Sequence, residues 1–184
     1  MTTDRGKAGA ALPHSKVRSA ELPWSAAAKL PPFRKSGSYA PALQMEGYMT
    51  KNTQARLLRA ARAAAKNAYA PFSEFGVGAA VLTARGRIFS GCNIENSSYG
   101  LTICAERVAI FKAVSAGERE IKAVLVYADT AKPTPPCGAC LQVINEFSEN
   151  PEVVLSNGRT TKTYRLRELL PLGFRLDHPA CQSE

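Results

Sequence analysis

Apolar residues follow a helical spacing over residues 57–68 and a strand-like spacing from residue 77 onward. The helical spacing predicts a helix that Asn52 or Thr53 can cap and that Pro71 follows. Two apolar runs come next, residues 77–83 and 88–94, and a short polar segment joins them. We expect these two runs to form a β-hairpin.

Helices and strands then alternate along the rest of the chain. The pattern predicts helices at about 105–116 and 138–147, strands at 121–128, 153–155 and 161–166, and a last helical turn at 167–170. Gly117 is suited to end the first of these helices, because glycine accepts the left-handed conformation common at helix C-termini. This alternation predicts an α/β protein with a sheet of mixed direction, flanked by helices.

Residues 1–48 lack this periodicity and are rich in Ala, Ser, Pro, Lys and Arg. Such a segment buries too little apolar area to offset its ordering entropy. We therefore expect a disordered or weakly ordered extension at 1–48 and one domain at 49–184, with Met49 as an alternative start. A targeting peptide is the other interpretation of the extension, although Pro31-Pro32 would break the amphipathic helix of such peptides.

Composition narrows the class of protein further. The chain has 184 residues, which suits one domain, and it contains no apolar run of the length that a membrane span needs. Of the net charge of +9, four charges fall in residues 1–48, and the rest follow without a run of like charges. No membrane partner and no nucleic-acid partner are expected. Five cysteines, two of them in a C-x-x-C, favour metal binding or free thiols in the cytoplasm over disulfides.

Two short segments carry the chemistry: Cys104-Ala105-Glu106 and Pro136-Cys137-Gly138-Ala139-Cys140. Three cysteines supply three zinc ligands, and a catalytic zinc site keeps its fourth position for water whereas a structural site closes with four protein ligands. Both segments lie at predicted helix N-termini, which stabilise thiolates. A zinc ligand followed by x-Glu, with a later Pro-Cys-x-x-Cys, is the signature of zinc deaminases that act on cytosine or adenine.

Each part of this prediction has an alternative. Cys92, His178 or Cys181 could supply a fourth ligand and close a structural site. Glu106 is the predicted proton carrier, although a glutamate at a helix N-terminus can serve the helix dipole alone. Arg107 either offsets the excess negative charge of three thiolates on Zn²⁺ or is a solvated helix arginine.

With these residues, the chain resembles the small homotetrameric zinc-dependent cytidine deaminases. The resemblance runs from about Thr50 to Phe174 and is densest in 91–107 and 136–143. It implies a three-layer α/β/α cytidine-deaminase-like fold with a mixed five-stranded sheet and Zn²⁺ as cofactor. It also implies hydrolysis of cytidine and 2′-deoxycytidine to uridine and 2′-deoxyuridine plus ammonia, in pyrimidine salvage.

The resemblance assigns further roles to single residues. Asn93 and Glu95 are similar to the pair that holds the ribose 3′-hydroxyl. Side chains two residues apart at the end of a strand point the same way, so both can reach one hydroxyl group. Phe75 resembles the aromatic residue that packs on the pyrimidine. The backbone N–H of Ala105 would face the cytosine O2.

The same resemblance implies an active site shared between subunits of a homotetramer. Phe174 matches an aromatic residue that reaches a neighbouring subunit's site, and Tyr99 would lie near the interface and the site. The alternatives are a deaminase of a cytosine nucleoside antibiotic of the blasticidin S type and, from other classes, an RNA-binding editor or a structural zinc module.

Overall fold

A computed structural model describes residues 49–176 of the chain. The extension predicted for residues 1–48 lies outside the described residues, as do His178 and Cys181. The helices are α1 (Lys51–Ala65), the 3-10 helix η1 (Tyr99–Leu101), α2 (Ala105–Ser115), α3 (Gly138–Glu146) and α4 (Leu166–Leu169). The strands are β1 (Val77–Thr83), β2 (Ile88–Cys92), β3 (Ile121–Ala128), β4 (Glu152–Ser156) and β5 (Thr161–Arg165).

The strands form one mixed sheet in the order β2-β1-β3-β4-β5. Strand β1 pairs antiparallel with β2 and β3, β3 pairs parallel with β4, and β5 returns antiparallel along β4. The predicted mixed five-stranded sheet and the predicted hairpin are confirmed.

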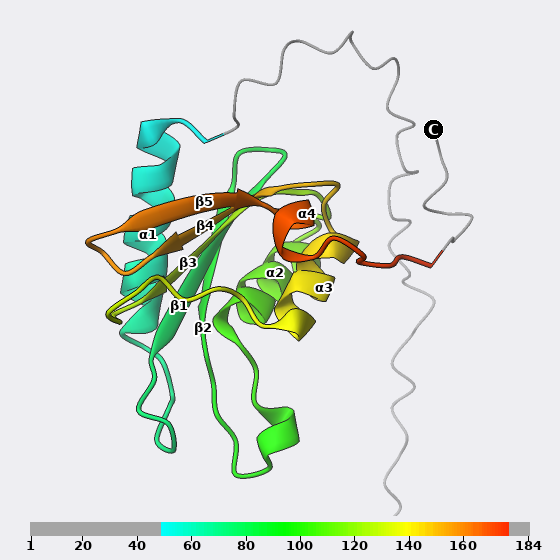
Figure 1. Ribbon diagram of the computed structural model, residues 1–184. Coiled ribbons are helices and arrows are strands. Elements are labelled where there is room, and N and C mark those ends of the chain that lie inside the picture. The colour runs from blue at the N-terminus through cyan, green and yellow to red at the C-terminus, as the bar shows by residue number, and fades with distance from the viewer. Residues whose placement is uncertain (1–48, 177–184) are drawn as a thin grey trace, which may run out of the picture. The chain divides into compact units, whose positions relative to one another are not determined.

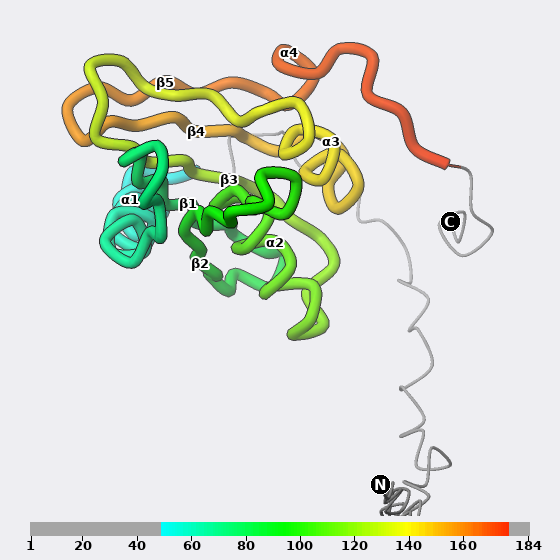
Figure 2. Tube along the Cα trace, turned by 90° about the horizontal axis from the view of Figure 1, so that it is seen from below, coloured from blue at the N-terminus to red at the C-terminus, as the bar shows by residue number. Residues whose placement is uncertain are grey.

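Helix α1 covers one face of this sheet, and α2 and α3 cover the other (Figure 1 and Figure 2). The side chains of β1 alternate accordingly: Ala80 packs beneath α1, while Ala79 and Val81 pack beneath α2 and α3. The buried apolar residues therefore form two clusters, one on each face of the sheet. This is the three-layer α/β/α arrangement that was expected.

Two glycines let the helices approach the sheet closely. A Cβ on Gly78 of β1 would lie 1.9 Å from the carbonyl oxygen of Ala61 in α1. A Cβ on Gly91 of β2 would lie 2.7 Å from the backbone nitrogen of Ala109 in α2. Only a residue without a side chain fits at these two contacts.

Beyond shifts of one residue at the ends of several elements, local details differ from the prediction at three places. The cap of α1 is Thr50, whose Oγ1 accepts from the N–H of Thr53 at 3.1 Å, rather than Asn52 or Thr53. Strand β2 ends at Cys92, and the Asn93 side chain that follows accepts from the N–H of Val77, the first residue of β1. The 3-10 helix Tyr99–Leu101 was not predicted. Gly117 does end α2, with a φ of 83°.

Within residues 49–176, no helix is both long enough and apolar enough to cross a bilayer.

Candidate active site

The three predicted zinc ligands meet at one point between α2 and α3. Cys104 is the N-cap of α2, Cys137 is the N-cap of α3, and Cys140 lies in the first turn of α3. Their sulfur atoms all lie within 4.8 Å of one another, with 3.8 Å between Cys104 and Cys137 and 3.5 Å between Cys137 and Cys140. Sulfurs held at about 2.3 Å by a tetrahedral zinc lie about 3.8 Å apart, so the cluster fits this ion.

The cluster already favours a thiolate before any metal binds. The pKa of Cys104 is lowered to about 5, first by a hydrogen bond from Cys140 and then by the neighbouring Arg107 guanidinium. The pKa of Cys140 is raised, because this thiol is the donor in that hydrogen bond and is buried. A thiolate at Cys104 is the ligand form that zinc requires.

Arg107 lies against the cluster rather than in solvent. Its Nη2 donates to the Cys104 sulfur at 3.4 Å and to the backbone oxygen of Thr102 at 3.1 Å. Within residues 49–176 its buried Nε has no hydrogen-bond partner. The guanidinium thus places a positive charge beside the sulfur ligand nearest to it.

Glu106 is almost fully buried at the start of α2, with 3% of its surface exposed. The pKa of its carboxyl group is raised to about 7, chiefly by desolvation and then by the negative charge of Cys104. A hydrogen bond from Cys140 joins this carboxyl group to the cysteine cluster. A carboxyl group that titrates near neutral pH can both accept and donate a proton under working conditions.

Within the described part of the chain, no fourth side chain joins the cysteine cluster. Cys92 lies at the end of β2, where its Sγ donates to the backbone oxygen of Asn67 at 3.3 Å. The other two candidates for a fourth ligand, His178 and Cys181, lie outside residues 49–176. The three-cysteine geometry therefore matches the open, catalytic type of site.

A buried amide that the sequence did not point to holds the loop leading to Cys137. Asn157, in the turn between β4 and β5, donates through Nδ2 to the backbone oxygens of Thr130 and Ala131, at 3.0 and 3.3 Å. Its Oδ1 accepts from the N–H groups of Arg159 and Thr160. Asn157 thus joins the β4–β5 turn to the loop 129–137, and its only sequence signal is a position in a predicted turn.

The residues expected at the ribose hold a neighbouring loop. Asn93 is 9% exposed, and its amide accepts from the N–H of Val77 and donates to the oxygen of Phe75, both at 2.8 Å. Glu95 accepts from the Ser73 hydroxyl and, at 2.8 Å, from the N–H of Phe72. These bonds lower the pKa of Glu95. Asn93 and Glu95 therefore shape the segment 72–77, which carries Phe75.

The predicted aromatic residues lie at the surface. Phe75 is 38% exposed, Tyr99 is 77% exposed, and the Tyr99 ring meets the Phe72 ring edge-on, with 6.0 Å between centroids. Ala105 is buried as the first residue of α2, immediately after Cys104. Its N–H is among those that have no acceptor within the helix.

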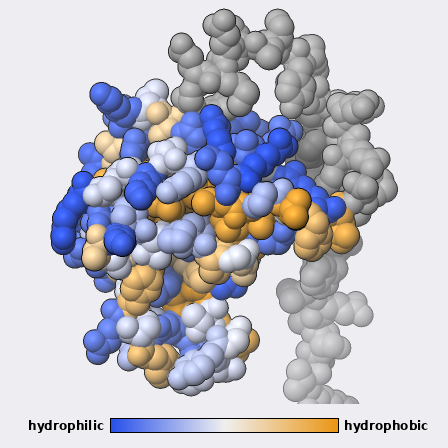
Figure 3. All heavy atoms as spheres, viewed as in Figure 1, coloured by the Kyte–Doolittle hydropathy of each residue, from blue (hydrophilic) through white to orange (hydrophobic). Residues whose placement is uncertain are grey.

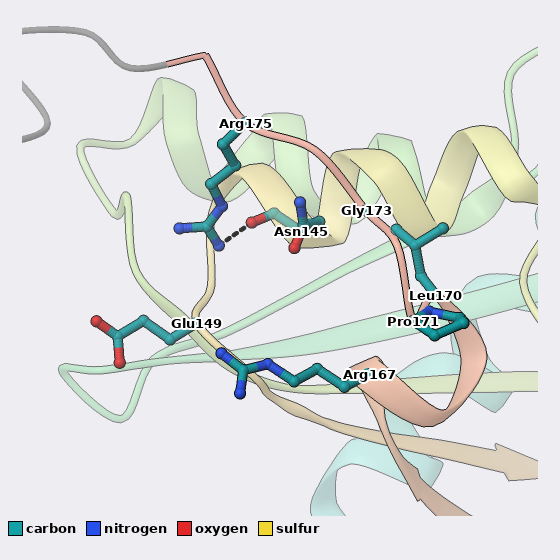
Figure 4. A pocket seen from close by; sticks show the side chains of 7 residues that line it. All are labelled: Asn145, Glu149, Arg167, Leu170, Pro171, Gly173 and Arg175. Atoms are coloured by element: carbon teal, nitrogen blue, oxygen red, sulfur yellow. Dashed lines mark hydrogen bonds between the residues drawn. The ribbon is translucent and has the colours of Figure 1, made fainter.

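Phe174 lies on another part of the surface, beside α3. Its backbone oxygen accepts from the side chains of Gln142 and Asn145, at 2.8 and 3.1 Å, while 66% of the residue is exposed. The same segment borders a pocket of about 540 Å³ at the C-terminal end of α3, into which Figure 4 looks. The side chain of Arg175 there donates to the backbone oxygen of Asn145. This pocket is separate from the cysteine cluster, which lies at the N-terminal end of α3.

Comparison with known proteins identifies the family. Residues 51–157 match the family model described as the cytidine and deoxycytidylate deaminase zinc-binding region. The chain belongs to this deaminase family.

Relatives agree over most of their length. The cytidine deaminase of Sporosarcina psychrophila is 56% identical over 92 residues, which are 50% of this chain and 68% of that protein. The cytidine deaminase of Halalkalibacterium halodurans is 48% identical over 120 residues, or 64% of this chain and 91% of that protein. A blasticidin-S deaminase of Bacillus cereus is 34% identical over 107 residues, or 53% of this chain and 76% of that protein.

A solved structure shows the same fold. The crystal structure of cytidine deaminase from Burkholderia pseudomallei superimposes with a TM-score of 0.64 at 46% identity, covering 68% of this chain and all of that one. Membership of the family makes this chain a zinc-dependent enzyme, and Cys104, Cys137 and Cys140 are the cluster that fits Zn²⁺.

Proposed function

We propose that this enzyme hydrolyses cytidine and 2′-deoxycytidine to uridine and 2′-deoxyuridine with release of ammonia, as a step of pyrimidine salvage. The observation that carries the proposal is the buried Glu106 carboxyl group, with its pKa raised to about 7, joined by a hydrogen bond to a cluster of three cysteines. The names of the similar enzymes from Sporosarcina psychrophila and Halalkalibacterium halodurans support cytidine as the substrate.

Zinc, when bound, supplies a Lewis acid that lowers the pKa of a coordinated water. Glu106 takes a proton from the attacking water and delivers it to ring N3 as the C4–O bond forms. The carboxylate then takes the proton of the new hydroxyl group and delivers it to the amino group. The C4–N bond breaks, ammonia leaves, and the C4 carbonyl of uridine remains.

Arg107 and the start of α2 assist this proton transfer in our proposal. Three thiolates and Zn²⁺ carry one net negative charge, and the Arg107 guanidinium at 3.4 Å from Cys104 offsets it. The N–H of Ala105 is the donor proposed for the cytosine O2. Both residues flank Glu106 in sequence, so the first turn of α2 brings acid–base, charge and substrate contacts together.

The proposed nucleoside contacts lie on the loops below the sheet in Figure 1. Phe75 packs on the pyrimidine, and Asn93 and Glu95 bind the ribose 3′-hydroxyl. In the structure these two polar side chains hold the segment 72–77, so binding of the sugar would add a ligand to an already ordered loop. Tyr99, whose ring meets Phe72, closes the same region.

We also propose that the enzyme is a homotetramer whose subunits share active sites. Large apolar side chains are exposed both on the lower loops and on the segment 171–176, and Figure 3 shows apolar residues at the surface in both places. Phe174 is the residue proposed to enter a neighbour's site. Phe174→Ala should raise KM for cytidine more than it lowers zinc content. A protein that elutes as a monomer from a sizing column and is fully active would contradict the shared site.

The catalytic unit in this proposal is residues 49–184, and residues 1–48 are dispensable. A chain that begins at Met49 should keep the elution volume of the tetramer and its activity. Loss of activity in this shortened chain would show that residues 1–48 belong to the enzyme. We place the reaction in the cytoplasm, because the four cysteines in residues 49–176 are free thiols, as a reducing compartment allows.

A substrate panel tests the activity. Loss of the absorbance of the cytosine ring is followed with cytidine, 2′-deoxycytidine, dCMP, cytosine and blasticidin S at equal concentrations. We expect turnover of the two nucleosides and little of the other three. Preference for blasticidin S, the substrate named for the Bacillus cereus relative, would replace the nucleoside proposal with the antibiotic one. Zinc binding without turnover of any compound would indicate a structural zinc module.

A further inference from the structure

The exposed side of α1 carries a continuous row of positive charge. Lys51, Arg56, Arg59, Arg62 and Lys66 are all exposed, and we call these five residues the basic stripe. Residues 47–73 contain no Asp or Glu. The stripe therefore accounts for five of the nine net positive charges of the chain, within sixteen residues.

Helix stability explains only part of the stripe, because Arg62 and Lys66 alone lie at the C-terminal end of α1, where the helix dipole favours a positive charge. Arg56, Arg59 and Arg62 follow one another at three-residue spacing and Lys66 follows after four, and like charges at these spacings repel on a helix surface. Lys51 lies in the first turn, where the helix dipole disfavours a positive charge. None of the ion pairs found between residues 49 and 176 involves the stripe.

The opposite side of α1 is buried in the core of the protein. Leu57 and Ala61 are fully buried against the sheet, and Gly78 lets the helix backbone lie directly on β1. Arg62 is held in place by the ring of Tyr127, with its guanidinium carbon 5.9 Å from the ring centroid. The stripe is thus a cationic surface on the opposite face of the sheet from the cysteine cluster.

We propose that the basic stripe binds a single strand of nucleic acid through its phosphates, without reading the bases. Arginine, the majority residue here, is the side chain best suited to phosphate oxygens. From Lys51 to Lys66 the helix rises about 22 Å, a length over which several successive phosphates of one strand can be contacted. The exposed residues between the cations, Asn52, Ala55 and Ala63, offer no ring for a base to stack on, so the proposed contacts are to phosphates alone.

A lipid surface fits the stripe less well. Helices that bind membranes in this orientation insert an apolar side below the headgroups. The apolar side of α1, with Leu57 and Ala61, is buried in the core and is not available for insertion. The proposal is independent of deamination, because the stripe and the cysteine cluster lie on different layers.

The test is fluorescence anisotropy of the full chain with a labelled 20-nucleotide oligouridylate, at salt concentrations from 50 to 200 mM. Uridine has no amino group to remove, so binding is measured without turnover. With five contacts we expect the slope of log K against log salt to be up to about −3.5, because each phosphate contact contributes about −0.7 for single strands.

Two matched triple variants locate the binding. Arg56→Gln/Arg59→Gln/Lys66→Gln should weaken binding at least about tenfold at 100 mM salt and make the slope smaller by about two. The control Arg119→Gln/Lys162→Gln/Arg167→Gln removes the same charge from exposed positions elsewhere and should change binding by less than about threefold. Cytidine turnover should be unchanged in both variants, which reports that they fold.

Equal weakening in the two variants would overturn the proposal, because it would show a response to net charge alone. Unchanged binding in the stripe variant would overturn it as well, since the contacts would then lie elsewhere in the chain. Stripe-dependent binding to phosphatidylserine vesicles without binding to the oligouridylate would assign the surface to lipid and also reject the proposal.

Discussion

Helices α1 and α2 pack on opposite faces of the same strands, β1 and β2, yet they place their charged residues differently. Each lies close to the sheet over one glycine, Gly78 for α1 and Gly91 for α2. The cations of α1 all remain in contact with water. In α2 the carboxyl group of Glu106 is buried beside a thiolate, and its pKa rises to about 7.

The difference shows how one packing arrangement serves two purposes. Burial at the first turn of α2 raises the pKa of the Glu106 carboxyl group, which suits the role of proton carrier that we propose for it. Exposure along α1 leaves its positive charges accessible to anions in solution.

Loss of one ligand has the largest expected effect. Cys140→Ala removes a buried sulfur from the cluster, so we expect loss of zinc and of measurable deamination. Cys104→Ala and Cys137→Ala should behave alike. Cys92→Ala and Cys181→Ala are the matched controls and should keep one zinc per chain by elemental analysis. A need for either control cysteine would indicate a closed structural site.

Burial of Glu106 predicts a pH-dependent stability in the zinc-free protein. Its folded pKa of about 7 lies above the ordinary glutamate value of 4.5, so the folded state holds this proton more tightly than the unfolded state. Wild type should therefore lose stability as pH rises from 4.5 to 7, relative to Glu106→Gln, which cannot ionise. At about 1.4 kcal/mol per pKa unit, the difference should level off near 3 kcal/mol above pH 7.

Urea unfolding of both zinc-free proteins at a series of pH values measures this difference. The comparison with Glu106→Gln matters because Cys104, with its pKa lowered to about 5, shifts stability in the opposite direction in both proteins. A difference that stays constant between pH 4.5 and 8 would show that Glu106 does not titrate in this range.

Substitutions at Gly78 and Gly91 test whether α1 and α2 contribute differently to activity. Gly91→Ala places a methyl group 2.7 Å from the α2 backbone, and Gly78→Ala places one 1.9 Å from the α1 backbone. Both variants should lose about 1–3 kcal/mol of stability through overpacking. Only Gly91→Ala should also lower kcat per folded molecule, because α2 carries Glu106. Equal losses of kcat would mean that α1 positions the site too.

The smallest effect is expected at the loop behind Cys137. Asn157→Ala removes the amide that holds Thr130 and Ala131, so zinc should transfer to a chelator up to about tenfold faster. Asn150→Ala is the control, since this side chain accepts from the N–H of Arg167 in a different turn. Equal rates of zinc release in the two variants would show that Asn157 does not help to retain zinc.

Regular spacing made most elements predictable. Strands β1 and β3 and the start of α2 have the bounds that apolar periodicity predicted. The three predicted zinc ligands lie together, as expected from their predicted positions at two helix N-termini. The bonds of Asn93 and Asn157 were not predictable, because each amide reaches a backbone sixteen or more residues away. Local sequence contains no trace of such long-range hydrogen bonds.

The basic stripe was missed for a different reason. The sequence was considered only for runs of consecutive Lys and Arg, whereas a helix brings residues three or four apart onto one face. Arg56, Arg59 and Arg62 have this spacing within a helix that was predicted. Charge spacing, read at the period of the predicted element, would have identified the surface.

The most direct test of the proton-carrier role is cytidine turnover by Glu106→Gln with zinc content measured on the same sample. The amide keeps the shape of the side chain but cannot accept the proton of the attacking water. We predict near-normal zinc with kcat lower by about 10²–10⁴ or more, the range of general acid–base catalysis. Zinc-loaded Glu106→Gln that retains more than about a tenth of wild-type activity would contradict the account, because that loss falls far short of this range.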